Sequence, residues 1–341
     1  MRRARGIFGK PPAHDLFDPA PEEDIEADTL EVIGAREKIQ GRSPWNLATQ
    51  RLRRDRAAMI ALAVIIIVIL VAIFAPVFAA LTGHPPNNQY PTTGLTPSGL
   101  PRAPSLRFLL GTDDQGRDLL VRIAYGTRIS LLVGVLSTAL TVIIGALVGL
   151  VAGYFGRFVD TVLSRLVDVT LSIPFLLFAI SLASIVTVTP LHLGPFVLHQ
   201  GISVVVVVIG FFSWATVARV VRGQVLSIRT KEYIEAARSL GAGSWRIIFV
   251  DVLPNVLAPI IVYATLLIPV SIVAEASLSY LGVGVPPPTP DWGAMIAEAQ
   301  NYYQQAWWFL VFPALALLIT TLAFNIFGDG VRDAFDPRLG R

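Results

Sequence analysis

Long stretches without a charged side chain alternate with short polar segments along this chain. The first uncharged stretch covers 57–81, and the longest extends from Val169 to Ala218. A helix needs about 20 apolar residues to cross the hydrocarbon core of a bilayer, so the longest stretch exceeds one span. The polar residues of 189–200 divide it. The pattern predicts six membrane-spanning helices, over about 57–81, 129–152, 166–188, 202–221, 255–278 and 307–327.

Two features inside the predicted spans bear on how they pack. Gly145, Gly149 and Gly153 recur at every fourth residue of the second span. A stripe of small residues lets two helix backbones approach closely in lipid, so we expect a helix–helix contact along this face. Pro174 lies inside the third span, where a proline predicts a kink.

The polar segment between the fourth and fifth spans predicts a helical elbow rather than an open loop. Ile234, Ala237 and Leu240 recur at helical spacing, and Gly241 follows where a helix-ending glycine belongs. Ser244 is in position to cap a second short helix directly after it. Its charged residues exclude this segment from the hydrocarbon core, so it lies at a membrane face.

The surface of this elbow has two interpretations that the residues alone leave open. Ala236 and Ala237 allow close approach of another backbone, and Glu235 can pair with a charge across such a contact. These features fit a docking surface for a soluble partner. They also fit an amphipathic helix that lies on lipid headgroups.

Composition places the chain among integral membrane proteins. Hydrophobic residues make up 54% of it and charged residues 15%, whereas soluble domains are about 25% charged. The absence of cysteine excludes disulfides and thiolate metal sites. A net charge of +3 gives little support for a nucleic-acid partner, and none is expected. The N-terminal segment lacks the apolar core of a cleavable signal peptide.

Basic residues set the expected orientation in the membrane. Four arginines between positions 51 and 56 precede the first span, whereas the segment between the fifth and sixth spans carries no Lys or Arg. By the positive-inside rule, both termini and the elbow are cytoplasmic. Five arginines between positions 102 and 128 run against this rule, because they fall on the outer side.

These patterns divide the chain into five segments. We expect a disordered cytoplasmic tail (1–45), a first span with its basic flank (46–82), and an extracytoplasmic loop that contains an interfacial helix (83–125). A five-helix core with the elbow at 223–253 follows (126–328), and then a cytoplasmic tail (329–341). Asp118 and Arg122 stand at i and i+4 in the interfacial helix, the favourable order for an ion pair.

The chain carries none of the catalytic or nucleotide-binding patterns that we sought. The patterns G-x-x-x-x-G-K-[ST], H-E-x-x-H and G-x-S-x-G are absent. We therefore expect no enzymatic activity, no metal and no cofactor bound by this chain. Asp168 and Glu275 lie near span ends, where we expect structural roles. His84, His192 and His199 are expected in solvated loops.

Several motifs together resemble a known family. Glu235-Ala236-Ala237, followed by Gly241 and Leu253-Pro254, resembles the EAA loop of ABC importer permeases. Three further segments resemble the dipeptide, oligopeptide and nickel branch of that family, in particular its second (C-type) permease subunit. They are Gly111-Thr112-Asp113 with Gly116-Arg117-Asp118 and 126–130, then 275–282 with Trp292-Gly293, and finally 327–337. The resemblance covers about 43–340.

The resemblance implies a fold, partners and a mechanism. The fold is the all-α, MetI-like fold of type I ABC importer permeases, with six transmembrane helices. The partners are a second homologous permease, two ABC ATPase subunits that bind ATP and Mg, an extracytoplasmic solute-binding protein, and the lipid of a bacterial or archaeal plasma membrane. Transport follows from alternating access, which the ATPases drive through the EAA loop.

The substrate and two other classes of function remain open at this level. Dipeptides, oligopeptides, nickel chelates and other small solutes all fit the family. A self-contained channel or ion-coupled carrier is the main alternative of another class, and a membrane scaffold without transport is a weaker one. Co-purification of an ATPase would distinguish the importer from both.

Overall fold

The computed structural model describes residues 44–188, 191–193, 196–198 and 201–336. The chain divides into two units, Met1–Asn46 and Leu47–Arg341. Nearly all of the predicted N-terminal tail lies outside the described residues, as do His199 and the last five residues of the chain.

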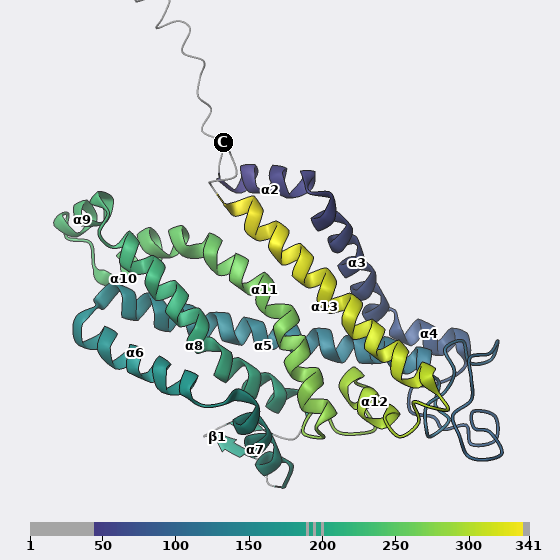
Figure 1. The fold of residues 1–341 in the computed structure, drawn as a ribbon. Helices are drawn as coiled ribbons and strands as arrows, with labels where there is room; N and C mark the ends of the chain where they lie inside the picture. Colours follow the sequence, from purple (N-terminus) through teal and green to yellow (C-terminus); the bar gives the residue numbers. More distant parts are fainter. Residues whose placement is uncertain (1–43, 189–190, 194–195, 199–200, 337–341) are drawn as a thin grey trace, which may run out of the picture. The chain divides into compact units, whose positions relative to one another are not determined.

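Helices form almost all of the described part of the second unit (Figure 1). In chain order the elements are α2 (Pro44–Arg54), α3 (Arg56–Ile73), α4 (Ala75–Thr82), α5 (Leu119–Phe155), α6 (Arg157–Ser172), α7 (Phe175–Val188), β1 (Leu191–Leu193), β2 (Phe196–Leu198), α8 (Ile202–Ile228), α9 (Glu232–Ser239), α10 (Ser244–Arg246), the π-helix η1 (Ile247–Val252), α11 (Leu253–Tyr280), α12 (Trp292–Ala299) and α13 (Trp307–Phe335). The two strands pair as a short antiparallel hairpin.

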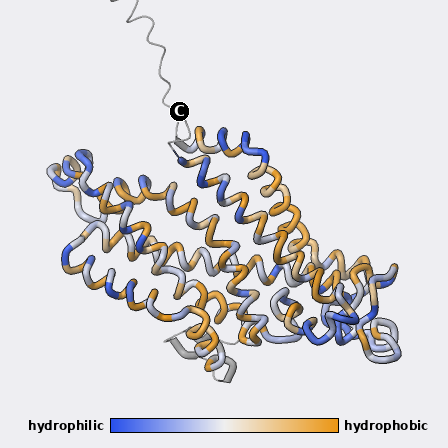
Figure 2. The backbone as a smooth tube through the Cα atoms, viewed as in Figure 1, coloured by the Kyte–Doolittle hydropathy of each residue, from blue (hydrophilic) through white to orange (hydrophobic). Residues whose placement is uncertain are grey.

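Five helical runs among the described residues are long and apolar enough to cross a membrane. They are α3, α5, α8, the continuous run from α10 to α11, and α13. A sixth candidate is α6 with the first part of α7, if this pair counts as one span bent by 82°. The prediction of an all-α membrane fold with six spans is confirmed in this form. Figure 2 shows apolar residues along these helices and hydrophilic ones gathered at α9 and in the segment before α5.

The break between α6 and α7 has a local cause. Pro174 has no backbone N–H and restricts the residue before it to extended conformations. Ile173 has φ −84° and ψ 123°, and α6 ends there. The predicted kink is therefore a sharp break of the helix.

α5 lies at the centre of the unit and makes its most extensive contact with α8. Gly145, Gly149 and Gly153 all lie on the side of α5 that faces α8. A Cβ atom added to any of the three would stand 2.6–2.7 Å from an atom of Val217, Ala218 or Val225. Side chains do not approach this closely, so the two backbones can pack at this distance only because these positions are glycine.

The last helix closes the unit on its other side, where α13 packs against both α3 and α11. Gly330 of α13 lies directly against Ala58 of α3. Arg51 donates a hydrogen bond from Nη1 to the carbonyl oxygen of Asp336 at 2.9 Å. The beginning of the described chain is thus fastened to its end.

Several predicted boundaries were wrong. The interfacial helix predicted before the second span is the first part of α5, which begins at Leu119 and continues without interruption. The predicted inner loop after Tyr154 is mostly α6, and the predicted C-terminal tail continues as helix to Phe335. The first span breaks at Phe74 into α3 and α4. Hydropathy marks where a helix can contact lipid, whereas capping and packing decide where it ends.

We predict that Gly149→Leu destabilises the α5–α8 contact, because the new side chain must displace Ala218 or Val221. Overpacking of this kind costs about 1–3 kcal/mol, which should lower the melting temperature of the full chain in detergent. Gly223→Leu is the matched control, since Gly223 lies on α8 with open space beside its Cα. Equal melting temperatures for the two variants would contradict this account of the glycines.

Candidate functional site

The segment between α8 and α11 forms the predicted elbow. α9 begins after Lys231, and its first turn contains Glu232 and Glu235, whose negative charge suits a helix N-terminus. At its other end, Gly241 has a φ of 82°. The N–H of Gly241 donates to the carbonyl of Arg238 at 3.0 Å, and the N–H of Ala242 donates to that of Ala237 at 3.1 Å. This pair of bonds is a Schellman motif, which ends α9 at the predicted glycine.

The second half of the elbow differs from the prediction. Ser244 does not cap a helix from outside, because it is the first residue of α10 and Gly243 precedes it as the cap. α10 continues through η1 into α11, so no independent short helix forms. Pro254 explains the wide π-helical turn before it, since its ring excludes a regular hydrogen bond and crowds the preceding turn. Leu253 donates instead to the carbonyl of Ile248.

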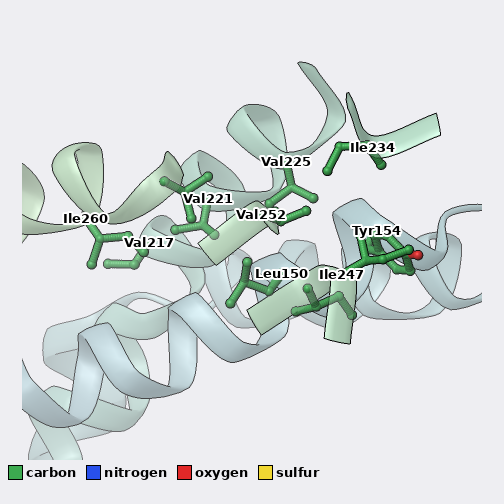
Figure 3. Close-up of a cluster of buried hydrophobic side chains, with 11 residues drawn as sticks. Leu150, Tyr154, Val217, Val221, Val225, Ile234, Ile247, Val252 and Ile260 are labelled. Atoms are coloured by element: carbon green, nitrogen blue, oxygen red, sulfur yellow. The ribbon is translucent and has the colours of Figure 1, made fainter. Parts of the chain in front are cut away.

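One side of α9 anchors it to the body of the unit. Ile234 is fully buried in a cluster of apolar side chains from α5, α8, η1 and α11 (Figure 3). Its neighbours there include Tyr154, Val225 and Ile247. A fully buried isoleucine contributes about 1.5–3 kcal/mol, so α9 is attached through this side chain and does not merely rest on the surface.

The other side of α9 is exposed. Glu235 and Ala236 are exposed, and Ala237 is half-buried. Leu240 is 88% exposed, so of the three apolar residues at helical spacing only Ile234 is fully buried. Large exposed side chains continue across the elbow at Tyr233, Trp245 and Phe249.

Two of these aromatic side chains have a fixed arrangement. The ring of Trp245 stacks on Phe249 at 6.1 Å between centroids. It also meets Phe155, the last residue of α5, edge to face at 5.8 Å. The exposed aromatic surface is therefore supported from beneath by α5 and η1.

A hollow of about 460 Å³ lies between α9 and the end of α5, with Glu235 on its wall. Arg157, Arg229 and Arg238 also line it. Arg229 donates from Nη1 to the carbonyl of Gly153 at 3.0 Å, and Arg238 lies 5.8 Å from the centre of the Tyr154 ring. Glu235 is the one acidic side chain that lines this basic hollow. A change of its charge would therefore alter the electrostatic potential of the hollow strongly.

The other motif residues gather at the opposite end of α5, in the segment before it. Gly111 and Gly116 adopt positive φ, 80° and 75°. Thr112 is buried and donates to the carbonyl of Gly94 at 2.6 Å. Asp118 caps α5 by accepting from the N–H groups of Leu120 and Val121.

The charged residues of this segment form a buried network. Arg117 donates to Asp113 at 2.5 Å, and Arg122 lies 3.1 Å from the same carboxylate. Glu298 of α12 adds a contact with Arg117 at 3.3 Å. The predicted side-chain pair between Asp118 and Arg122 does not form, because Asp118 is engaged in the cap. It pairs with His84, whose Nδ1 lies 2.7 Å from the Asp118 carboxylate.

One further prediction for this end is corrected. His84 is buried and stacks on Phe108, so it is not a solvated loop histidine. Asp113, Asp114 and Glu298 bring carboxylate oxygens within 4.8 Å of one another. Arg117 and Arg122 form ion pairs with these carboxylates, and burial raises the pKa of Glu298 while the arginines oppose this rise. This arrangement is an ion-pair network that joins α12 to α5.

A comparison with known proteins decides the family. The family described as binding-protein-dependent transport system inner membrane component matches residues 145–341, more than half of the chain. The chain belongs to this family. The N-terminal transmembrane domain of oligopeptide transport permease C also matches, over residues 43–97.

Individual relatives of this permease match over nearly their full length. It is 39% identical to a dipeptide transport system permease protein of Alkalihalophilus pseudofirmus, over 87% of this chain and 91% of that one. It is also 39% identical to an oligopeptide transport system permease protein of Bacillus subtilis, over 90% and 94%. A glutathione transport system permease protein of Pectobacterium atrosepticum is 38% identical, over 87% and 92%.

A solved structure shares the fold of this permease. A chain of the MetNI methionine ABC transporter, in an inward-facing conformation, aligns with a TM-score of 0.50 at 22% identity. The alignment covers 62% of this chain and 96% of that one. Together with the family match, it confirms the predicted MetI-like fold. The permease is a multi-pass membrane protein.

Some residues of the permease escaped prediction from the sequence. The exposed aromatic side chains of the elbow were not singled out, although Trp245 and Phe249 stand at i and i+4 of a helix. Asp168 was placed near a span end, and it pairs there with Arg219 of α8 at 2.9 Å. Glu275 was expected near a span end as well, but it is fully buried.

We predict that Gly241→Ala loosens α9, because alanine at positive φ costs about 1–2 kcal/mol. Hydrogen exchange of the amides in 234–240 should accelerate about tenfold. Gly243→Ala is the matched control two residues away. Gly243 also has open space for a Cβ, but its φ is −66°, so its exchange should stay near that of the unchanged chain. Equal effects of both variants would show that the left-handed turn does not hold α9.

Proposed function

We propose that this permease is one of two homologous membrane subunits of an ATP-driven importer of small peptides. The main support is the match of 43–97 to the N-terminal domain of oligopeptide transport permease C. That segment lies outside the stretch matched by the general family. The relatives named for dipeptides, oligopeptides and glutathione, itself a tripeptide, support the same substrate class. A related permease for nickel or another small solute is the alternative within the family.

The remaining partners follow from the same proposal. Two ABC ATPase subunits bind ATP and Mg, since the sequence of this chain contains no phosphate-binding loop. An extracytoplasmic solute-binding protein delivers the peptide and selects it. This chain binds no nucleotide itself.

The elbow supplies the contact with an ATPase subunit. Glu235, Ala236, Ala237 and Gly241 lie on or end α9, and Leu253-Pro254 begin the span that follows. α9 presents a small exposed surface at Ala236 and a large apolar side chain at Leu240. Helix-in-groove docking uses such a surface, with apolar side chains as anchors.

The buried side of the elbow explains how a movement reaches the membrane. Ile234 belongs to one apolar cluster with side chains of α5, α8, η1 and α11, so a displacement of α9 can reach three spans through this cluster. ATP-driven closure of the ATPases favours one position of α9, and the spans follow as alternating access. Such coupling requires that the ATPase bind the two conformations with different affinity.

The orientation that fits this function places α9 and both termini in the cytoplasm. Arg53 and Arg54 precede the first span at this end, and Arg246 lies in the elbow. The arginines that ran against the rule include Arg117 and Arg122, which are buried among Asp113, Asp114 and Glu298. An arginine that is paired with a carboxylate counts less towards the positive-inside rule than an unpaired one. The outer arginines are therefore a weaker exception to the rule than their number suggests.

We predict that Glu235→Arg abolishes co-purification of the ATPase and peptide uptake, while the permease still inserts in the membrane. Reversal of a charge in a desolvated contact costs about 2–5 kcal/mol, and the hollow beside it already holds three arginines. Arg165→Glu on α6 is the control, because it also reverses one charge, in the opposite sense, at an exposed site outside the elbow. Unchanged ATPase binding and uptake in Glu235→Arg would favour a self-contained carrier whose elbow lies on lipid.

We predict opposite sidedness for the two ends of the spans. This permease has no cysteine, so Leu106→Cys and Ser239→Cys each introduce a single thiol at an exposed position. An impermeant maleimide should label the first variant in intact cells. The second should react only after permeabilisation. The reverse pattern would overturn the orientation and leave α9 out of reach of a cytoplasmic ATPase.

A further inference from the structure

Two acidic side chains are buried side by side where α12 meets α11. Glu275 lies on α11, and Asp291 caps the N-terminus of α12. Both are fully buried. Gly293, two residues after Asp291, lies directly against Ala276, the residue after Glu275, so both carboxyl groups are buried in the same contact between α11 and α12. Neither takes part in the ion-pair network of Asp113 or in the elbow.

The hydroxyl groups around Glu275 account for both of its oxygens. Ser130 of α5 donates to Oε2 at 2.9 Å, and Ser279 of α11 donates to Oε1 at 3.2 Å. Asp291 accepts from the N–H of Gly293 at 2.7 Å through Oδ1. Its Oδ2 is buried and finds no donor among the described residues.

That unpartnered oxygen implies a proton between the two acids. Two carboxylates buried in one helix contact repel each other, and burial disfavours the charged form of both. A carboxylate oxygen also cannot bond to another one unless one of the two is protonated. One proton on the pair supplies the missing donor for Oδ2 and removes one of the two buried charges.

Other charged groups on the surrounding elements are engaged elsewhere. Arg128 of α5 is exposed and lies over the ring of Tyr125. Glu298 of α12 pairs with Arg117. The charged residues of α13 (Asp329, Arg332 and Asp333) lie in its last two turns, whereas α12 packs near its beginning. Burial raises the pKa of Asp291, whereas hydrogen bonds from Ser279 and from the N–H groups of Gly293 and Ala294 oppose this rise.

The position of the pair gives the proton a structural consequence. Trp292 follows Asp291 directly and donates to the carbonyl of Ile123 at 3.2 Å. Gly293 lies so close to α11 that an added Cβ would stand 2.8 Å from the carbonyl carbon of Ala276. The N-terminus of α12 is thus pressed against α5 and α11 around the two acids.

We propose that Glu275 and Asp291 bind one proton between them, and that this proton fastens α12 to α11 as a pH-sensitive latch. Removal of the proton leaves two adjacent carboxylates in a buried site, and α12 separates from α11 to let water reach them. No covalent bond changes, since a single proton passes between the pair and solvent.

The direction of the pH dependence follows from the raised affinity for the proton. Burial raises the pKa of Asp291, so the latched state binds more protons than a state in which α12 is open. The latch is therefore strongest at low pH. It weakens as the pH rises from the ordinary range of carboxyl groups towards the raised pKa of Asp291.

Thiol accessibility tests the latch in the complete permease. Met295 of α12 is fully buried, whereas Tyr303, shortly after the same helix, is 54% exposed. Met295→Cys and Tyr303→Cys each place one thiol in a chain without cysteine. The ratio of their maleimide reaction rates removes the intrinsic pH dependence of the thiol. We expect this ratio to rise at least about tenfold between about pH 6 and about pH 9, as for an opening linked to one proton.

Neutral substitutions of Glu275 and Asp291 distinguish the effect of a shared proton from the effect of packing. Glu275→Gln keeps the size of the side chain and a donor for Asp291, so the ratio should stay low across the whole pH range. Asp291→Asn, which retains a good helix cap, should behave in the same way. Glu275→Ala removes the acceptor of both serines and should raise the ratio at every pH.

Two results would overturn the latch. A ratio for the unchanged pair that stays low and flat over this pH range would show that no proton controls α12. A high ratio in both Glu275→Gln and Asp291→Asn at all pH values would show that both groups are needed as anions.

Discussion

The close contact between α5 and α8 determines where every other part of this permease lies. Three glycines bring the two backbones together over two turns of helix, with Val217, Ala218 and Val225 against them. α8 leads directly into the elbow, and α5 ends beneath it at Tyr154 and Phe155. A wider spacing of the two helices would separate the side chains among which Ile234 is buried. The geometry of the proposed docking surface therefore depends on the contact between these two spans, which begins at Gly153 and Val225 directly beneath it.

The two ends of the spans solve the problem of charge in different ways. At the elbow, arginines remain near the surface and line an open hollow beside Glu235. At the α12 end, Arg117 and Arg122 are buried against carboxylates, and Asp118 is engaged with His84 and a helix cap. The charged surface at the elbow can attract a charged partner. At the α12 end, the charged side chains pair with one another and hold α12 to the segment before α5.

Periodicity and hydropathy predicted the spans, the glycine stripe, the break at Pro174 and the glycine that ends α9. Each of these depends on neighbours within a few residues along the chain. The wrong predictions about side-chain partners concern residues that are not neighbours along one helix. Asp118 stands four residues from Arg122, yet its side-chain partner is His84, and Arg122 pairs with Asp113. The burial of Glu275 likewise depends on Ser130 and Asp291, which sequence spacing alone could not bring together.

The fastening of α3 to α13 has a consequence for the order in which the molecule is made. Among the described spans, α3 leaves the ribosome first and α13 last, so Ala58 waits for Gly330 until all the spans between them are made. α3 is suited to this delay, because it is the most apolar candidate span and only 22% of it is buried by the rest of the unit, against 61% for α8. Lipid can solvate α3 alone until its neighbour arrives. α8 is buried to a much greater extent, chiefly against α5, which precedes it along the chain.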